Sequence, residues 1–194
     1  MRHRNVLALA MLVPCHAVSG QESGIESGGI SRALEMPAHR VLIDTIADEG
    51  AELAPFETDG CSGGLSGVWR LVSAQLPDFA AAHQAAPPWE SCCVTHDRAY
   101  HDITGAQDAN ASYDARLQAD AALRSCVVQT GETRKARLAA HYEVDVATVE
   151  QAYQVIAESM YLAVRFGGGP CSGLPWRWGY GWPDCSILQL GGAE

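Results

Sequence analysis

Two cysteines, Cys92 and Cys93, stand side by side in the sequence, and they constrain the fold more than any other feature. Adjacent side chains on a helix point about 100 degrees apart, so a bond between these two sulfurs would be strained. Each cysteine must therefore tie its helix to a different part of the chain. Cys61, in a glycine-rich stretch, and Cys126, in a later helical stretch, are the obvious partners. We predict the disulfides Cys61–Cys93 and Cys92–Cys126.

The first residues have the character of an export signal. The basic residues Arg2 and Arg4 precede an apolar run over residues 6–13, and small residues follow it. We therefore expect residues 1–19 to be a cleavable signal peptide and the mature protein to be secreted or periplasmic. A lipid-modified Cys15 at the end of the run is the alternative.

Removal of this segment leaves an even set of cysteines, which in an exported chain indicates disulfides. The two that remain unassigned, Cys171 and Cys185, flank a segment rich in glycine, proline and tryptophan. A bridge between them would supply order that the composition of the segment does not. We therefore expect a third disulfide, Cys171–Cys185.

Composition and charge bound the class of protein. Hydrophobic residues make up 47% and charged residues 19% of the 194-residue chain, as in a soluble globular protein and unlike a disordered one. The formal net charge of -10 disfavours nucleic acid and strongly anionic membranes as partners. After the N-terminal run, no segment stays apolar for the roughly 20 residues that a membrane helix requires.

Hydrophobic periodicity predicts a mainly α-helical fold with few candidate strands. Residues 20–30, rich in serine, glycine and glutamate, are predicted to be a flexible linker, and residues 31–194 to be one domain. Gly131 should end one helix before the next begins. The predicted helices cover residues 66–76, 90–104, 111–128, 132–142 and 149–166, with a weaker candidate within 31–54.

The helix predicted at 90–104 carries the residues best suited to chemistry. Helical spacing places Cys92, His96 and Tyr100 along one stripe, with Asp97 on the neighbouring one. The two disulfides would hold this helix against the glycine-rich loop on one side and against the next helix on the other.

A carboxylate on that next helix is placed to meet the histidine. Asp120 lies six residues before Cys126, close to two helical turns, so it can reach the face that carries His96. A buried carboxylate there would orient the imidazole by accepting its second ring proton. Asp114, one and a half turns earlier, is the weaker rival.

The pattern CCxxHDxxY at residues 92–100, with a glycine-rich loop before it and DxxxxxC at residues 120–126 after it, resembles the secreted phospholipase A2 family. The resemblance covers residues 56–128. It implies a disulfide-linked antiparallel helix pair with a glycine-rich calcium loop, here followed by additional C-terminal helices. The implied activity is calcium-dependent hydrolysis of the sn-2 ester of a glycerophospholipid by a monomer at a membrane or micelle surface, releasing fatty acid and lysophospholipid.

The resemblance also implies roles for single residues. His96 would be the general base that deprotonates a water, with Asp120 as its partner and Tyr100 steadying Asp120. Asp97 would bind Ca2+ together with backbone carbonyls of the loop, and hard oxygen ligands suit that ion. The implied carbonyl ligands are those of Gly60, Ser62 and Gly64.

The chain departs from the family pattern around this loop. The loop holds a single cysteine in the sequence DGCSGG, Ala99 stands where a cysteine is frequent, and the interval from Gly64 to Cys92 is long. These differences bear on the register of the loop, and hence on which carbonyls would bind calcium. Asp59 is a candidate for a further carboxylate ligand.

Two other functions fit parts of the pattern. A zinc site would use His96 with Cys92 or His101, since the i, i+4 spacing suits zinc, but an even set of cysteines in an exported chain argues for disulfides. A non-catalytic lipid- or protein-binding module on the same scaffold is the other alternative. The intact set of His96, Asp97 and Asp120 favours the enzyme.

The C-terminal stretch alternates aromatic residues with Arg177, Gly179 and Gly181. It would serve equally well to insert into a lipid surface or to pack on the disulfide-closed loop. The aromatic residues are Trp176, Trp178, Tyr180 and Trp182.

Overall fold

The computed structural model describes residues 23–61 and 65–187. Over these residues the protein is mainly α-helical and contains no strand, as the periodicity predicts. None of the helices in these ranges is both long and apolar enough to span a membrane. The helices are α1 (Ser23–Ala47), α2 (Leu65–Gln75), α3 (Pro77–His83), α4 (Glu90–Asp102), α5 (Ala109–Tyr142) and α6 (Val146–Gly167), with a 3-10 turn at Ile103–Gly105 between α4 and α5.

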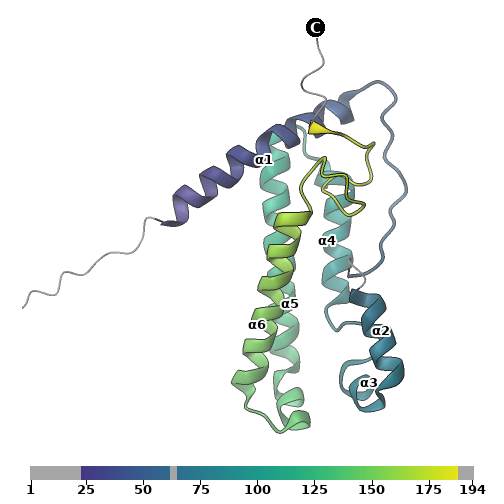
Figure 1. Cartoon of the computed structure of the whole chain (residues 1–194), viewed down its shortest axis with the longest axis vertical. Helices are drawn as coiled ribbons and strands as arrows, with labels where there is room; N and C mark the ends of the chain where they lie inside the picture. Colours follow the sequence, from purple (N-terminus) through teal and green to yellow (C-terminus); the bar gives the residue numbers. More distant parts are fainter. Residues whose placement is uncertain (1–22, 62–64, 188–194) are drawn as a thin grey trace, which may run out of the picture.

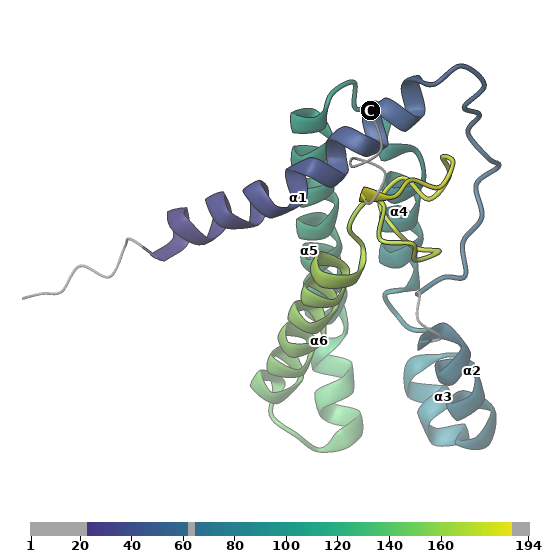
Figure 2. The ribbon, with the colours of Figure 1, turned by 45° about the horizontal axis from the view of Figure 1, so that its top comes forward.

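Helix α5 is the element around which the others are arranged. Helix α6 packs along it, α4 lies beside it, and α1 crosses its N-terminal part (Figure 1). The turned view in Figure 2 shows that the first turns of α1 extend beyond the other helices. In both views α2 and α3 lie at the end of the molecule opposite α1, where the chain passes from α5 to α6.

Local sequence explains where the two site-bearing helices begin and end. Helix α4 ends where Ile103 adopts a left-handed conformation with φ 57°. Asp108 caps α5, because its carboxylate accepts hydrogen bonds from the backbone N–H groups of Asn110 and Ala111 at 2.8 and 2.9 Å. The polypeptide therefore reverses within a few residues, and this short connection keeps α4 next to α5.

The prediction that Gly131 separates two helices is wrong, because α5 continues through this residue to Tyr142. A Cβ added at Gly131 would lie 2.5 Å from Cγ of Tyr153 on α6. The glycine therefore allows α5 and α6 to approach closely. This packing outweighs the cost of a glycine in a helix interior, about 1 kcal/mol.

The predicted linker at residues 20–30 is also wrong in part, because α1 begins at Ser23. The predicted signal peptide at 1–19 lies outside the described residues. Helix formation is cooperative, so a segment of low propensity can extend a helix whose later turns are held by packing. Those later turns carry His39 and Leu42, both with 0% of their surface exposed.

All three predicted disulfides are present: Cys61–Cys93, Cys92–Cys126 and Cys171–Cys185. The first ties the segment before α2 to α4, the second joins α4 to α5, and the third closes the tail. A bonded Cys92 has no thiolate to offer a metal ion, so the zinc site built from Cys92 and His96 is wrong. Bonds of this kind indicate an oxidising environment outside the cytosol.

Two apolar clusters stabilise this arrangement. The first lies among α4, α5 and α6 and includes Trp89, Val127 and Tyr153. The second joins α1 and α4 to the tail and includes Leu42 and Trp178. Helices α4 and α5 contribute to both clusters, with Cys92 and Leu123 in the first and Tyr100 in the second.

The aromatic tail is in part a packing element. Trp178 is fully buried, and its Nε1 donates to Oγ of Ser112 at 2.9 Å. The backbone N–H of Gly179 donates to the carbonyl of Tyr100 at 2.7 Å, which fixes the tail against α4. Trp176, in contrast, is 40% exposed. Of the two predicted roles, packing is confirmed for Trp178, whereas Trp176 lies at the surface.

Candidate active site

The structure brings His96, Tyr100 and Asp120 together in the interior. His96 and Tyr100 lie one turn apart on α4, and the Cys92–Cys126 bond holds this helix against α5, which carries Asp120. Nε2 of His96 lies 2.9 Å from Oδ1 of Asp120, and the Tyr100 hydroxyl donates to the same oxygen at 2.7 Å. Asp120 has no exposed surface.

Asp114, the weaker rival for this role, lies elsewhere. Its side chain is 60% exposed and pairs with Arg32 of α1 at 2.6 Å. The partner of His96 is therefore Asp120.

The hydrogen bond to Asp120 fixes the tautomer of His96. Because a carboxylate only accepts, Nε2 must carry the proton, and Nδ1 is left with its lone pair. Nδ1 lies 4.0 Å from Oδ1 of Asp97. Burial lowers the pKa of His96. The hydrogen bond to Asp120 and the nearby carboxylate of Asp97 raise this pKa by more than burial lowers it, so the net shift is upward. The imidazole is thus a stronger base than a free histidine.

Two arginines that the sequence analysis missed complete the surroundings of Asp120. Nη1 of Arg165, on α6, donates to Oδ2 of Asp120 at 3.0 Å. Nε of Arg116, fully buried on α5, donates to the Tyr100 hydroxyl at 3.2 Å. Arg116 stands four residues before Asp120, and this spacing places the two side chains on the same face of the helix, so Arg116 could have been predicted. Nothing in the sequence pointed to Arg165.

A second carboxylate balances the two arginines. Glu35 of α1 forms ion pairs with both Arg116 and Arg165. Burial alone would raise the pKa of Glu35, but His39, the two arginines and Ser31 lower it to about 2. Buried charges are costly unless they are paired. Two arginines and two carboxylates, Glu35 and Asp120, therefore form a network next to His96 whose formal charges cancel.

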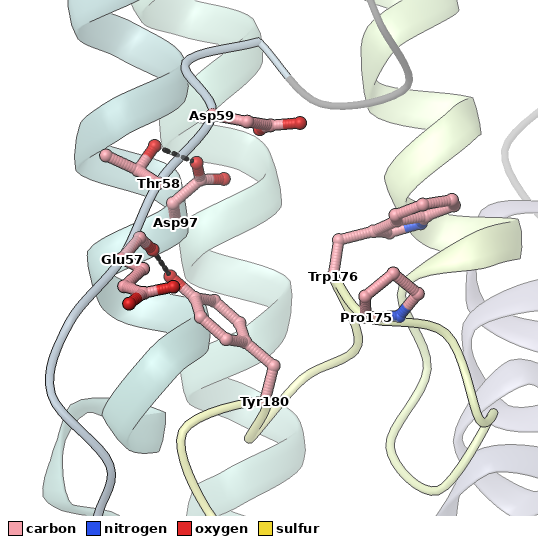
Figure 3. A pocket seen from close by; sticks show the side chains of 7 residues that line it. All are labelled: Glu57, Thr58, Asp59, Asp97, Pro175, Trp176 and Tyr180. Carbon is pink, nitrogen blue, oxygen red and sulfur yellow. Dashed lines mark hydrogen bonds between the residues drawn. The ribbon is translucent and has the colours of Figure 1, made fainter.

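On the outer side of His96, Asp97 points into a pocket of about 390 Å³. Figure 3 shows Thr58 and Asp97 facing each other on one side of it, with Pro175 and Trp176 across from them. Oγ1 of Thr58 donates to Oδ2 of Asp97 at 2.6 Å and accepts from the backbone N–H of Gly60 at 3.1 Å. The other residues that line the pocket are Glu57, Asp59 and Tyr180.

These side chains carry the kind of ligand atom that calcium prefers. The polar groups that Glu57, Thr58, Asp59, Asp97 and Tyr180 bring to the pocket are all oxygens, which hard cations prefer. Within residues 23–61 and 65–187, however, no group of three or more histidine, cysteine, aspartate or glutamate side chains is arranged to hold a metal ion. Backbone carbonyls would have to complete the set.

The predicted carbonyl ligands lie partly within the described residues. Gly60 has φ +83°, and a Cβ there would lie 2.7 Å from Oε1 of Glu90 and 2.8 Å from Oγ of Ser66, so only glycine fits this bend. Hydrogen bonds through Thr58 link Gly60 to Asp97. The other two predicted ligands, Ser62 and Gly64, lie outside the described residues.

A second pocket, of about 270 Å³, meets His96 and Asp97 from the other side. The bonded pair Cys61 and Cys93 contributes to it, and α5 and α6 supply mostly apolar side chains. No pattern in the sequence predicted a contribution from α6 to the site. The residues from these two helices are Leu123, Ser159, Met160, Ala163 and Val164.

The site therefore combines an oriented histidine, a carboxylate beside it and an apolar pocket next to both. His101, the alternative zinc ligand, instead packs edge-on against Phe56 and Tyr180. No family model matches the chain, no curated protein matches it, and no solved structure matches its fold at a significant level. The resemblance to secreted phospholipase A2 enzymes therefore rests on the motif residues alone.

Proposed function

We propose that this protein is a calcium-dependent, phospholipase A2-like esterase that cleaves the sn-2 acyl ester of a glycerophospholipid. The observation that carries the proposal is the hydrogen-bonded series Tyr100, Asp120 and His96, which leaves Nδ1 of the histidine as the acceptor beside Asp97 and an apolar pocket. In this proposal α4 and α5 are the disulfide-linked antiparallel pair, and the segment around Gly60 is the calcium loop.

His96 acts as the general base. Its Nδ1 takes a proton from a water molecule as the water oxygen attacks the ester carbonyl, so no covalent enzyme intermediate forms. The imidazolium is stabilised by the carboxylate of Asp120, which Tyr100 and Arg165 hold in place. When the ester C–O bond breaks, the proton passes from Nδ1 to the leaving oxygen. The products are a fatty acid and a lysophospholipid.

Asp97 is the side-chain ligand proposed for Ca2+, with the carbonyls of Gly60, Ser62 and Gly64. When bound there, calcium would polarise the ester carbonyl and stabilise the charge that develops on its oxygen. Oγ1 of Thr58 donates to the carboxylate of Asp97 at 2.6 Å and so orients this proposed ligand.

The pocket beside His96 is the proposed place for the acyl group. Leu123, Met160 and Val164 give it apolar walls, and burial of an alkyl chain against them supplies binding energy in proportion to the area covered. The substrate is a phospholipid at a membrane or micelle surface, reached by an exported monomer. The exposed Trp176 at the calcium pocket is suited to contact such a surface.

The test measures fatty-acid release from phosphatidylcholine vesicles by the purified protein, with calcium or with a chelator. We expect calcium-dependent release that falls about 100- to 10,000-fold in His96→Ala. Asp97→Asn should need far more calcium for the same rate. Asp114→Asn is the matched control, because Asp114 is exposed and lies on the same helix as Asp120, and it should behave as wild type.

Two results would count against the proposal. Release that a chelator leaves unchanged would remove calcium from the mechanism. No release by folded wild type at any calcium concentration would favour the non-catalytic lipid- or protein-binding module.

A further inference from the structure

The ion pairs behind Asp120 connect the candidate active site to α1, a helix outside the residues 56–128 that resemble the phospholipase A2 family. Helix α1 crosses the N-terminal part of α5 in both views (Figures 1 and 2). The carboxylate of Glu35, on α1, accepts from Arg116 of α5 at one oxygen and from Arg165 of α6 at the other. One side chain therefore joins three helices.

Both arginines continue from Glu35 to the hydrogen-bonded series of the site. Nη1 of Arg165 donates to Oδ2 of Asp120 at 3.0 Å, and Nε of Arg116 donates to the Tyr100 hydroxyl at 3.2 Å. A guanidinium group is planar and carries its donors in a rigid fork, so the nitrogen bound to Glu35 sets the position of the others. The carboxylate on α1 thus helps to place the donors that meet Asp120 and Tyr100.

These contacts lie where water replaces them poorly. Arg116 and Asp120 have no exposed surface, and the side chain of Glu35 is 20% exposed. Removal of one partner from a buried ionic network leaves the remaining charges uncompensated. Without the charge of Glu35, two guanidinium groups would share the single carboxylate of Asp120. The geometry that orients His96 would then change.

We propose that Glu35 is a positioning residue of the active site, which holds the carboxylate of Asp120 in the arrangement that orients His96. It acts through Arg165 and Arg116. Helix α1 is thereby part of the site, although it contributes no residue to either pocket there. The effect of Glu35 on a reaction rate rests on the proposed esterase function, whereas its effect on the hydrogen bond between His96 and Asp120 does not.

The first experiment observes this hydrogen bond by proton NMR of the purified protein. The Nε2 proton of His96, bonded to Asp120, should give a downfield resonance that is absent from His96→Ala. We expect Glu35→Gln to shift or broaden this resonance, because the carboxylate is no longer held from behind. Arg32→Gln is the matched control, since Arg32 lies one turn earlier on α1 and pairs with the exposed Asp114. It should leave the resonance unchanged.

The second experiment measures fatty-acid release from phosphatidylcholine vesicles by the same variants, where circular dichroism shows each of them folded. Glu35→Gln should lower kcat about 10- to 100-fold with KM little changed, because Glu35 lies outside both pockets and supports the site only indirectly. Arg32→Gln should retain the wild-type kcat. Glu35→Gln combined with Arg165→Gln should lose less than the product of the two single losses, because Glu35 acts through that arginine.

Three outcomes would overturn the proposal. A resonance that is unchanged in Glu35→Gln, or absent from the wild type, would mean that Glu35 does not set the hydrogen bond of His96. Equal effects of Glu35→Gln and Arg32→Gln would assign the role to the docking of α1 as a whole. An unchanged kcat in Glu35→Gln would remove Glu35 from the reaction.

Failure of the proposed function would be recognised separately. In that case the folded wild type releases no fatty acid, yet the resonance of His96 still changes in Glu35→Gln and not in Arg32→Gln. That result would contradict the esterase and support the positioning role of Glu35.

Discussion

Near the start of α5, Asp120 has no exposed surface, and its two carboxylate oxygens accept from His96, Tyr100 and Arg165. Toward the other end of the same helix, Nε1 of Trp89 has no hydrogen-bond partner in the described residues, and the buried Tyr153 hydroxyl has only the guanidinium of Arg134 beside it. The first region is complete within the protein, and its charges cancel. In the second, Arg134 and Arg137 donate to the carbonyl of Ala82 and form no ion pair within the described residues. This difference indicates that the polar groups around Asp120 hold one another in a fixed arrangement, whereas those around Tyr153 are held by fewer hydrogen bonds.

The largest effect on stability should come from a substitution at Asp120, in the centre of the first region. Asp120→Asn leaves Arg165 facing a neutral amide in a buried setting, and removing one partner of a buried ion pair costs about 3–5 kcal/mol. Urea unfolding at pH 7 would measure the loss. Asp114→Asn should change stability by less than about 0.5 kcal/mol, because that carboxylate is exposed. Similar losses in both variants would contradict the network.

The next effect depends on pH and tests Glu35. Its pKa in the folded protein, about 2, is below the ordinary value of 4.5. The ionised carboxylate therefore stabilises the fold at pH values above the unfolded pKa, and this contribution is lost as the pH falls toward 2. At pH 7 we expect Glu35→Gln to be less stable than wild type by about 2 kcal/mol.

Unfolding of the two proteins over a pH series would check this sign. The gap between them should close as the pH is lowered from about 5 to about 2, following the titration of the carboxyl group. Glu132→Gln, which changes an exposed carboxylate of α5, serves as the control. A gap that stays constant with pH would mean that packing, and not charge, accounts for the effect of Glu35.

The spacing of the cysteines and of the motif residues made part of this site predictable from the sequence. Adjacent cysteines have to bond outward, so helical geometry gave Cys92 and Cys93 partners on different elements, and all three predicted disulfides are present. With α4 and α5 joined, the six-residue interval from Asp120 to Cys126 placed the carboxylate at the histidine. Short-range spacing carried this information.

The rest depended on contacts between distant segments. Arg165 meets Asp120 across 45 positions and Glu35 across 130, and no local pattern signals either contact. Gly131 is a helix breaker by propensity, but the ring of Tyr153 packs against it and the helix continues. The calcium ligands, the substrate and the catalytic roles stay predictions, since no comparison with known proteins bears on them.

The smallest effect sharpens the comparison between the two regions most directly, because the same substitution is made in each. Tyr100→Phe removes a hydroxyl that donates to Asp120 and accepts from Arg116, and it should cost about 1–2 kcal/mol of stability. Tyr153→Phe removes a hydroxyl that makes no well-formed hydrogen bond in the described residues and has only the guanidinium of Arg134 beside it, so stability should change by less than about 0.5 kcal/mol. Urea unfolding of both variants gives the answer. A loss of stability in Tyr153→Phe equal to that in Tyr100→Phe would mean that the Tyr153 hydroxyl is already well bonded within the protein.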